Sequence, residues 1–514
     1  MSDSRTKNAT RNIAFGFLNR VITMVLPFAT RTIVLYLLGA NYLGIGSLFT
    51  SVLGFLSLAE LGFASAIVYA MYRPVAEKDY ERVGALLNFF RNLYRGVGTA
   101  ILLVGTCLAP FLPHLIKGEP PAGVNVYILY YIYLANSVIG YFFAGYRNSL
   151  LHAFQRNDII SNIGSCANLL VQFAQIAVLY ATKNFYAYAF APILGTLISN
   201  AVVYYITRRR YPEIKPQGKI SQEAKREILT KISGLFGTKL NSIVVHSTDA
   251  LVISAFLGLT ATAQFGNYYL IMNSVAAFVL ILFSSLTPGI GNKLALDSNA
   301  EARRLFDNLS FMNEWLVGVC CACFLCLYEP FMLVWVGEEL TLGFGFALCM
   351  TVYFFIYMIQ RTILTFKDAA GIWAQDKARP YVSMIINVGS CLILVQYIGL
   401  HGVILSTIIA FGVSLPWANR VLFKNLFGES GNANLGRVLI AAAKTSVVCA
   451  ICYALCAFCP SGFIGVFARL FLAFVVANAL WWALSFKRPE YAFAKARVEG
   501  ALGGVYRKLA RRLG

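Results

Sequence analysis

Long apolar runs separated by short basic connections dominate this sequence. About fourteen of these runs are long enough for a helix of about 20 residues to cross a bilayer. Only 13% of the residues are charged, whereas a soluble domain carries about 25%. The sequence therefore predicts an all-α polytopic membrane protein and excludes a soluble enzyme. The expected spans are 12–38, 41–72, 88–113, 124–150, 160–182, 184–206, 229–257, 261–290, 310–336, 342–368, 380–398, 401–423, 437–459 and 463–486.

Lysine and arginine gather in alternate connections between these spans. If the N-terminus is cytoplasmic, nearly all the basic connections face the cytoplasm, and only Lys117 and Lys183 lie in outer ones. Cytoplasmic loops carry this excess of positive charge in membrane proteins. The pattern predicts that both termini are cytoplasmic. Because the net charge of +20 is spread over all the inner connections, no nucleic-acid partner is expected.

A short internal repeat divides the chain. Leu38-Gly39 recurs as Leu257-Gly258, an offset of 258 − 39 = 219 residues. Transporters are often built from two similar bundles. The repeat predicts an N-lobe with six spans, a basic linker, a C-lobe with six spans, two extra helices and a basic cytoplasmic tail. Their expected limits are 1–207, 208–228, 229–425, 426–486 and 487–514.

Three of the basic residues inside the expected spans are candidate ligands of a central cavity. Arg20 and Arg31 are eleven residues apart and share one helix face, separated by roughly 16 Å along the axis. The repeat brings Lys239 to the same depth as Arg20. Charged groups within a membrane usually face a cavity or a partner, so these three are predicted to bind an anionic substrate in a central cavity. Snorkelling or structural pairing is the alternative interpretation.

Other polar residues within the spans have weaker predicted roles. Asp249 and His246 follow Lys239 on the same helix and are candidates for a counter-charge or for coupling to H⁺ or Na⁺. Candidates for a gate or for the cavity wall lie nearer the inner ends of their spans, where a loop role competes; they are Glu60, Glu314, Gln360 and Arg361.

No catalytic residue and no cofactor is predicted. Nearly all of the twelve cysteines lie inside apolar runs. The spacing of Cys449, Cys452, Cys456 and Cys459 could indicate a metal site. Because the chain has only four histidines and none lies near these cysteines, we expect the cysteines to pack as small apolar residues and to hold no metal.

The first two spans resemble a known family. The similarity runs through Arg11-Asn12, Arg31, residues 37–44 (LLGANYLG), residues 55–62 (FLSLAELG) and residues 71–76 (MYRPVA), and returns at residues 265–269 (FGNYY). These segments resemble the bacterial polysaccharide exporters, the O-antigen and capsule flippases of the multidrug/oligosaccharidyl-lipid/polysaccharide superfamily.

The resemblance implies both a fold and an activity. The fold would be two six-helix lobes about a pseudo-twofold axis, with two added helices, in the bacterial inner membrane. The activity would be alternating access that moves an undecaprenyl-diphosphate-linked oligosaccharide from the inner to the outer leaflet through a cationic cavity. Membrane lipids, and the glycosyltransferases and polymerase of the same pathway, would be its partners.

Three alternatives remain at this stage. A lipid II flippase shares the architecture, but its motifs match less well. A multidrug cation exporter of the same superfamily should have an acidic cavity, whereas bases outnumber acids on the first and seventh spans. A membrane glycan polymerase or ligase would need a sizeable outer loop, and the longest one expected here, 112–124, is short. The sequence has no G-x-x-x-x-G-K-[ST] motif for ATP.

Overall fold

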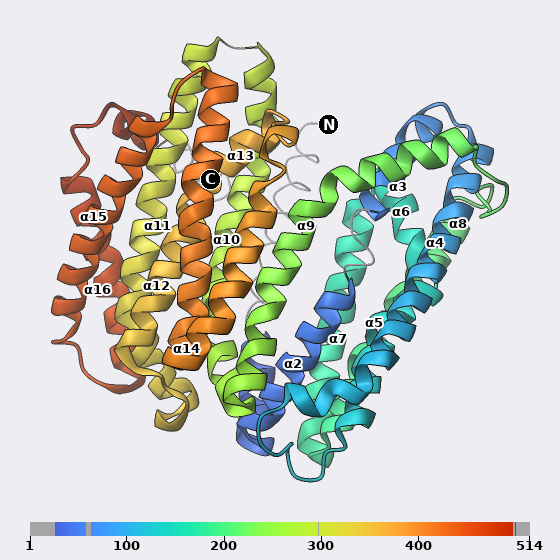
Figure 1. Ribbon diagram of the computed structural model, residues 1–514, viewed down its shortest axis with the longest axis horizontal. Coiled ribbons are helices and arrows are strands. Elements are labelled where there is room, and N and C mark those ends of the chain that lie inside the picture. The colour runs from blue at the N-terminus through green and yellow to red at the C-terminus, as the bar shows by residue number, and fades with distance from the viewer. Residues whose placement is uncertain (1–25, 58–62, 297, 497–498, 500–514) are drawn as a thin grey trace, which may run out of the picture. The chain divides into compact units, whose positions relative to one another are not determined.

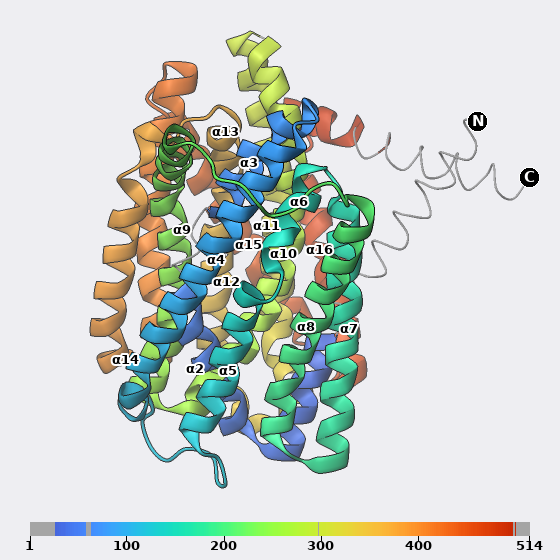
Figure 2. The ribbon, with the colours of Figure 1, turned by 90° about the vertical axis from the view of Figure 1, so that its right-hand side faces the viewer.

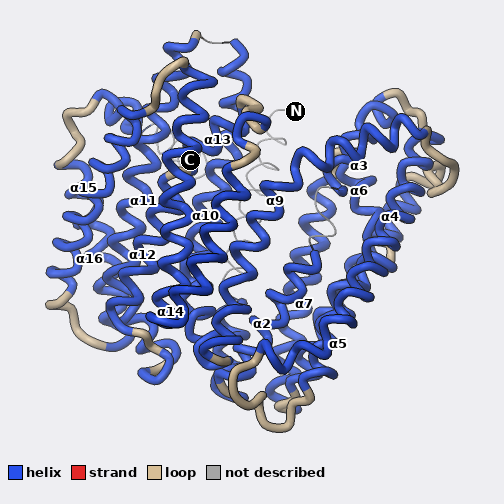
Figure 3. The backbone as a smooth tube through the Cα atoms, viewed as in Figure 1, coloured by secondary structure: helices blue, strands red, loops and turns tan. Residues whose placement is uncertain are grey.

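The protein is helical throughout the part that the structure describes. The computed structural model describes residues 26–57, 63–296, 298–496 and 499, and no strand occurs in these ranges. Figure 3 shows the helices and the short loops that join them. This confirms the all-α prediction.

Nine of the described helices are long and apolar enough to cross a membrane, or ten if the bent pair α5 and α6 forms one span. Three shorter apolar helices accompany them, including Leu26–Leu38. Because a bilayer core needs about 20 apolar residues per helix, the chain is a multi-pass membrane protein.

The chain divides into two compact units, Met1–Gly266 and Asn267–Gly514 (Figure 1). Within the described residues, the first unit contains the helix Leu26–Leu38 and the beginning of α10 (Leu259–Leu296). Its other helices are α2 (Ala40–Leu56), α3 (Phe63–Ala76), α4 (Tyr80–Leu108), α5 (Val126–Phe142), α6 (Asn148–Ala153), α7 (Asn157–Thr182), α8 (Phe185–Arg210) and α9 (Gln222–Leu257). Figure 2 shows α7 and α8 side by side, in agreement with their contacts.

The first unit has an apolar core between α2, α4 and α5. Phe49 packs edge-on against Tyr130, with ring centroids 5.5 Å apart. The Tyr130 hydroxyl donates to the carbonyl of Gly105 at 2.8 Å, so its polar end is satisfied within the core. A second cluster around Met71, Phe90 and Leu150 fills the end of the unit where the segment after α8 crosses α4.

The second unit contains the remainder of α10 and the helices that follow. These are α11 (Asn299–Val336), α12 (Gly343–Ile359), α13 (Arg361–Ala369), α14 (Arg379–Leu422), α15 (Asn432–Cys456) and α16 (Gly462–Ala483). Helix α11 packs against α12, α15 and α16. Close contact with α16 depends on Gly318, because a Cβ there would lie 2.3 Å from the indole nitrogen of Trp481.

Helix α14 is longer than a single span and contains a sharp break. Gly399 has φ 57° and ψ −132°, outside the helical region. Because an L-residue with a side chain rarely adopts this conformation, glycine permits the turn. The break lies between the expected spans 380–398 and 401–423 and agrees with their separation.

Two further glycines form matching joints inside the first unit. Gly39 separates Leu26–Leu38 from α2, with φ 103° and ψ 171°. Gly258 separates α9 from α10, with φ 95° and ψ 179°. In each joint the glycine N–H donates to the carbonyls four and five residues earlier. The offset of 219 residues found in the sequence therefore relates two joints with the same backbone geometry.

Candidate functional site

Arg31 links the first described helix to the beginning of α10. Its Nη2 donates to the carbonyl oxygen of Ala263 at 3.1 Å, and the side chain is half-buried. Gly266 makes this approach feasible, because a Cβ there would lie only 2.6 Å from Arg31 Nη2. The guanidinium is therefore held at a defined position beside the beginning of α10.

Two polar side chains of α7 make hydrogen bonds to neighbouring helices, one of them to the helix that carries Arg31. The Thr30 hydroxyl donates to the amide oxygen of Gln172 and to the carbonyl of Leu26 at 2.9 Å. One turn further along α7, Gln175 Nε2 donates to the carbonyl of Tyr188 at 3.2 Å. The interior of the first unit is thus partly polar, as expected for helices that line a substrate path rather than only face lipid.

Asp249 lies in α9 and is buried, with 4% of its surface exposed. Its Oδ1 has no hydrogen-bond partner among the described residues. The adjacent Ser247 and Thr248 are also buried, and Ser247 Oγ would lie 2.6 Å from a Cβ placed at Gly54 of α2. Because a buried carboxylate oxygen without a hydrogen bond is costly, Asp249 is suited to take up and release a proton or a cation.

Several predicted residues cannot be placed with Arg31 and Asp249. Arg20 and Glu60 lie outside the described residues. Lys239 and His246 belong to α9, whose backbone is described there, but their side chains lie outside the described part. Their roles stay predictions.

The remaining predicted residues lie in the second unit. Glu314 is buried on α11 and lies 3.8 Å from Arg488 Nη1, an ion-pair distance. The preceding residue, Asn313, donates from Nδ2 to the carbonyls of Met358 and Ile359 at 3.0 and 3.3 Å. Asn313 thereby satisfies the end of α12 at its break.

The break between α12 and α13 carries the other two predicted residues. Gln360 is buried, and its Oε1 has no hydrogen-bond partner in the described part of the chain. The Arg361 guanidinium lies over the ring of Tyr357, 4.2 Å from its centroid, at cation–π distance. Broken helices often mark ion or substrate sites in transporters, so both remain candidates for the cavity wall.

One buried ion cluster was missed by the sequence reasoning. Asp376 lies between Lys367 and Arg379, all three of them buried. Arg379 Nη1 also donates to Ser414 Oγ at 2.7 Å. Lys367 and Arg379 belong to the positive charge that the sequence assigns to the cytoplasmic side. Both are buried in ion pairs with Asp376, and the hydrogen bond to Ser414 links this cluster to the second half of α14.

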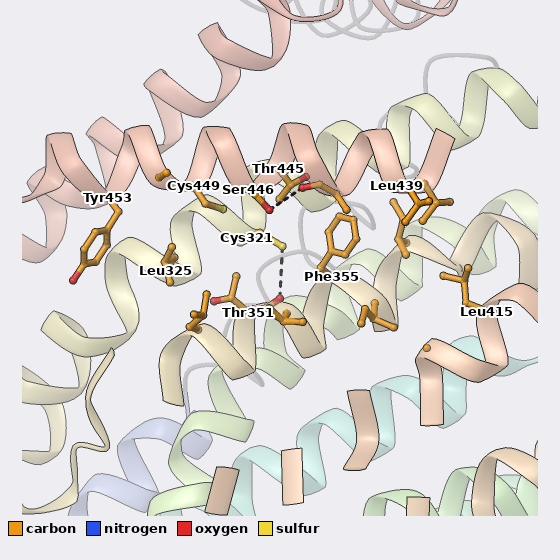
Figure 4. Close-up of a pocket in the computed structure, with 18 of the residues that line it drawn as sticks. Cys321, Leu325, Thr351, Phe355, Leu415, Leu439, Thr445, Ser446, Cys449 and Tyr453 are labelled. Carbon is orange, nitrogen blue, oxygen red and sulfur yellow. Dashed lines mark hydrogen bonds between the residues drawn. The ribbon is translucent and has the colours of Figure 1, made fainter. Parts of the chain in front are cut away.

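An apolar groove in the second unit was also missed. It encloses about 810 Å³ between α11, α12, α14 and α15. Figure 4 shows Cys321 and Leu325 of α11 on its floor, Thr351 and Phe355 on one side, and Leu439 on the facing side. Helical periodicity indicates which residues of each helix are apolar, but not whether two apolar faces meet or leave a gap between them.

The chain is similar to known proteins in both sequence and fold. The family described as "Polysaccharide biosynthesis protein" matches residues 9–292. No curated protein matches the chain. Three solved structures are similar to it in fold.

The first is an inward-facing multidrug resistance MATE family transporter of the MOP superfamily, with 16% identity, coverage of 79% of this chain and 96% of that one, and a TM-score of 0.63. The second is the lipid II flippase MurJ in an inward closed conformation, with 13% identity, 92% and 98% coverage, and a TM-score of 0.64. The third is the Vibrio cholerae MATE transporter VcmN in the bent form, with 13% identity, 80% and 95% coverage, and a TM-score of 0.51.

At these identities the three structures establish the fold alone, which agrees with the predicted superfamily architecture. The family match covers more than half of the 514 residues and extends from the first span into α10. The predicted resemblance is thus confirmed at the level of the family, and the chain belongs to the polysaccharide biosynthesis protein family.

Proposed function

We propose that this protein is a flippase that moves an undecaprenyl-diphosphate-linked oligosaccharide from the inner to the outer leaflet of the bacterial inner membrane. Membership of the polysaccharide biosynthesis family and the fold of MOP superfamily transporters support a transporter. The observation that supports the substrate class is the half-buried guanidinium of Arg31, which donates to the Ala263 carbonyl in the first unit.

A guanidinium at this position suits a diphosphate headgroup. It carries five N–H donors in a planar fork and stays protonated, so it can bind phosphate oxygens in a bidentate manner. Charge-assisted hydrogen bonds of this kind strengthen where water is excluded. The lipid tail would stay in the bilayer while the phosphates pass these cations. Arg20 and Lys239 join Arg31 as predicted ligands of the same headgroup.

The test replaces each cation in the full-length protein. We expect Arg20→Ala, Arg31→Ala and Lys239→Ala each to lower flipping about tenfold or more, the effect of losing a hydrogen bond to a charged group. Flipping is measured in proteoliposomes as the fraction of lipid-linked oligosaccharide that becomes accessible to a membrane-impermeant reagent. Arg208→Ala, at the exposed end of α8, is the matched control and should transport normally.

The result also separates the alternatives. Wild-type rates for all three variants, in protein that elutes as a folded species, would refute the diphosphate site. Transport of lipid II or of an organic cation by the wild-type protein, without transport of the oligosaccharide lipid, would reassign the substrate.

We further propose that Asp249 couples transport to an ion gradient, because its buried carboxyl has an oxygen without a partner among the described residues. Asp249→Asn keeps the shape and removes the exchangeable charge. We expect this variant to flip substrate at a rate that no longer responds to an imposed proton or sodium gradient. A response equal to that of the wild type would refute the coupling role.

A further inference from the structure

The apolar groove of the second unit continues into a mouth that carries one basic side chain, Arg420. A smaller cavity of about 430 Å³ adjoins it and shares two lining residues with it, Pro416 and Leu435. The mouth lies where α14 ends and α15 begins, and its polar lining residues are Trp417, Arg420, Ser430 and Asn432. One continuous surface thus runs from an apolar channel to a basic end. Such a surface is complementary to a molecule with an apolar chain and an anionic headgroup.

The groove itself offers little to a polar ligand. The Ser446 hydroxyl donates to the Ala442 carbonyl of its own helix at 3.0 Å, and Thr351 donates to Ala347 at 2.8 Å. The rim is open, since Leu439 is 71% exposed. In a bilayer such an open apolar channel is filled by hydrocarbon, because the solvent around it is lipid and not water.

The charge at the mouth is a single cation. Arg420 is exposed and makes no ion pair with a described acidic residue. The neighbouring arginines already have acidic partners. Arg303 pairs with Asp307 and Glu429, and Arg437 pairs with Asp307. One available guanidinium therefore matches a headgroup with one negative charge, such as a phosphodiester, better than it matches a diphosphate.

The length of the groove determines how far a bound acyl chain can reach along it. Leu435 and Tyr453 line opposite ends of the α15 wall, and eighteen helical residues span about 27 Å. A bilayer core is about 30 Å thick, so a chain anchored at one surface reaches about half of the groove. Gly412 lies in the half near the mouth, one turn before Pro416, whereas Ala450 lies in the far half.

We propose that this groove binds an anionic phospholipid of the surrounding bilayer, with its phosphodiester at Arg420 and one acyl chain in the near half beside Gly412. The lipid would bridge α14 and α15 across the opening and add to the contacts that α11 already makes with α15 and α16. This site is independent of the proposed transport activity, because the lipid is a resident ligand and not the cargo.

Binding to the purified full-length protein tests the proposal. The probes are dioleoylphosphatidylglycerol and dioleoylphosphatidylcholine, titrated in detergent and counted by native mass spectrometry. We expect phosphatidylglycerol to bind about tenfold more tightly, since it adds one charge-assisted contact. Arg420→Gln should abolish this preference. Lys424→Gln removes an exposed charge from the same connection, outside the groove lining, and should preserve it.

Blocking the groove tests where the chain lies. A Cβ at Gly412 would meet nothing within 4 Å, so Gly412→Phe should fill the near half without a clash and weaken both lipids several-fold. Gly389→Phe is the matched control, because Gly389 is exposed on the same helix with the same open space but does not line the groove. Ala450→Phe fills only the far half and should leave binding unchanged.

Three results would overturn the proposal. Equal affinity for the two lipids would remove the charge recognition. Equal losses from Arg420→Gln and Lys424→Gln would indicate nonspecific surface charge. Equal losses from Gly412→Phe and Ala450→Phe would indicate an occupant that spans the whole groove, such as a polyprenyl chain. None of these results depends on whether the protein transports a lipid-linked oligosaccharide.

Discussion

The joints at Gly39 and Gly258 have the same backbone but different surroundings. Both glycines have φ near 100° and an extended ψ, and the residues two positions beyond them bond to each other, since Thr260 Oγ1 donates to Asn41 Oδ1 at 2.7 Å. A Cβ at Gly39 would meet nothing within 4 Å, whereas a Cβ at Gly258 would lie 3.0 Å from the carbonyl oxygen of Lys117.

The second joint is clamped by the segment that follows α4. Lys117 N–H donates to the Ser254 carbonyl at 3.0 Å, and its Nζ donates to the Phe256 carbonyl at 2.7 Å. In return, Ser254 Oγ donates to the Leu115 carbonyl at 2.7 Å. The position equivalent to Ser254 in the first joint is Leu35, which cannot make this bond. Two repeats with one backbone turn can therefore differ in how firmly that turn is held.

The largest expected effect is at the clamped joint. Gly258→Ala places a side chain in a region of φ and ψ that is essentially restricted to glycine, which costs about 1–3 kcal/mol, and adds the contact with Lys117. We expect a loss near 3 kcal/mol in the free energy of unfolding, measured by denaturant titration of the purified protein in detergent. Wild-type stability would mean that the joint relaxes freely.

Gly39→Ala should cost less than Gly258→Ala. The backbone strain is the same, but the added methyl group enters open space, so we expect a loss of about 2 kcal/mol. The same titration measures it. If Gly39→Ala is the more destabilising of the two, the difference in packing between the joints does not control their stability.

The smallest effect should come from removing one bond of the clamp. Ser254 is fully buried, and Ser254→Ala removes its bond to Leu115, which stabilises the fold by about 1 kcal/mol. It also leaves the Leu115 carbonyl without this donor. Protection of the Leu115 segment in hydrogen exchange should fall, while protection around Gly39 should not change. Equal changes at both joints would show that they are coupled rather than independent.

Much of the fold follows from local sequence features. Apolar runs of the length of a bilayer core predict the helices, because a backbone in lipid must satisfy its own hydrogen bonds. The repeat marks Gly39 and Gly258, and the limits of the expected spans isolate Gly399; the structure shows a positive φ at all three, a conformation that excludes most side chains. The basic charges within the first span likewise follow from the sequence, and for Arg31 the structure describes how one of them is held.

The tertiary structure alone decided the features that depend on pairing between distant residues. Asn313 satisfies the broken end of α12, Asp376 neutralises Lys367 and Arg379, and α15 leaves a groove beside α12. Composition and periodicity specify which face of a helix is apolar and where its charges lie. They do not specify which helix it meets, because that choice depends on the packing of side chains far apart in the chain.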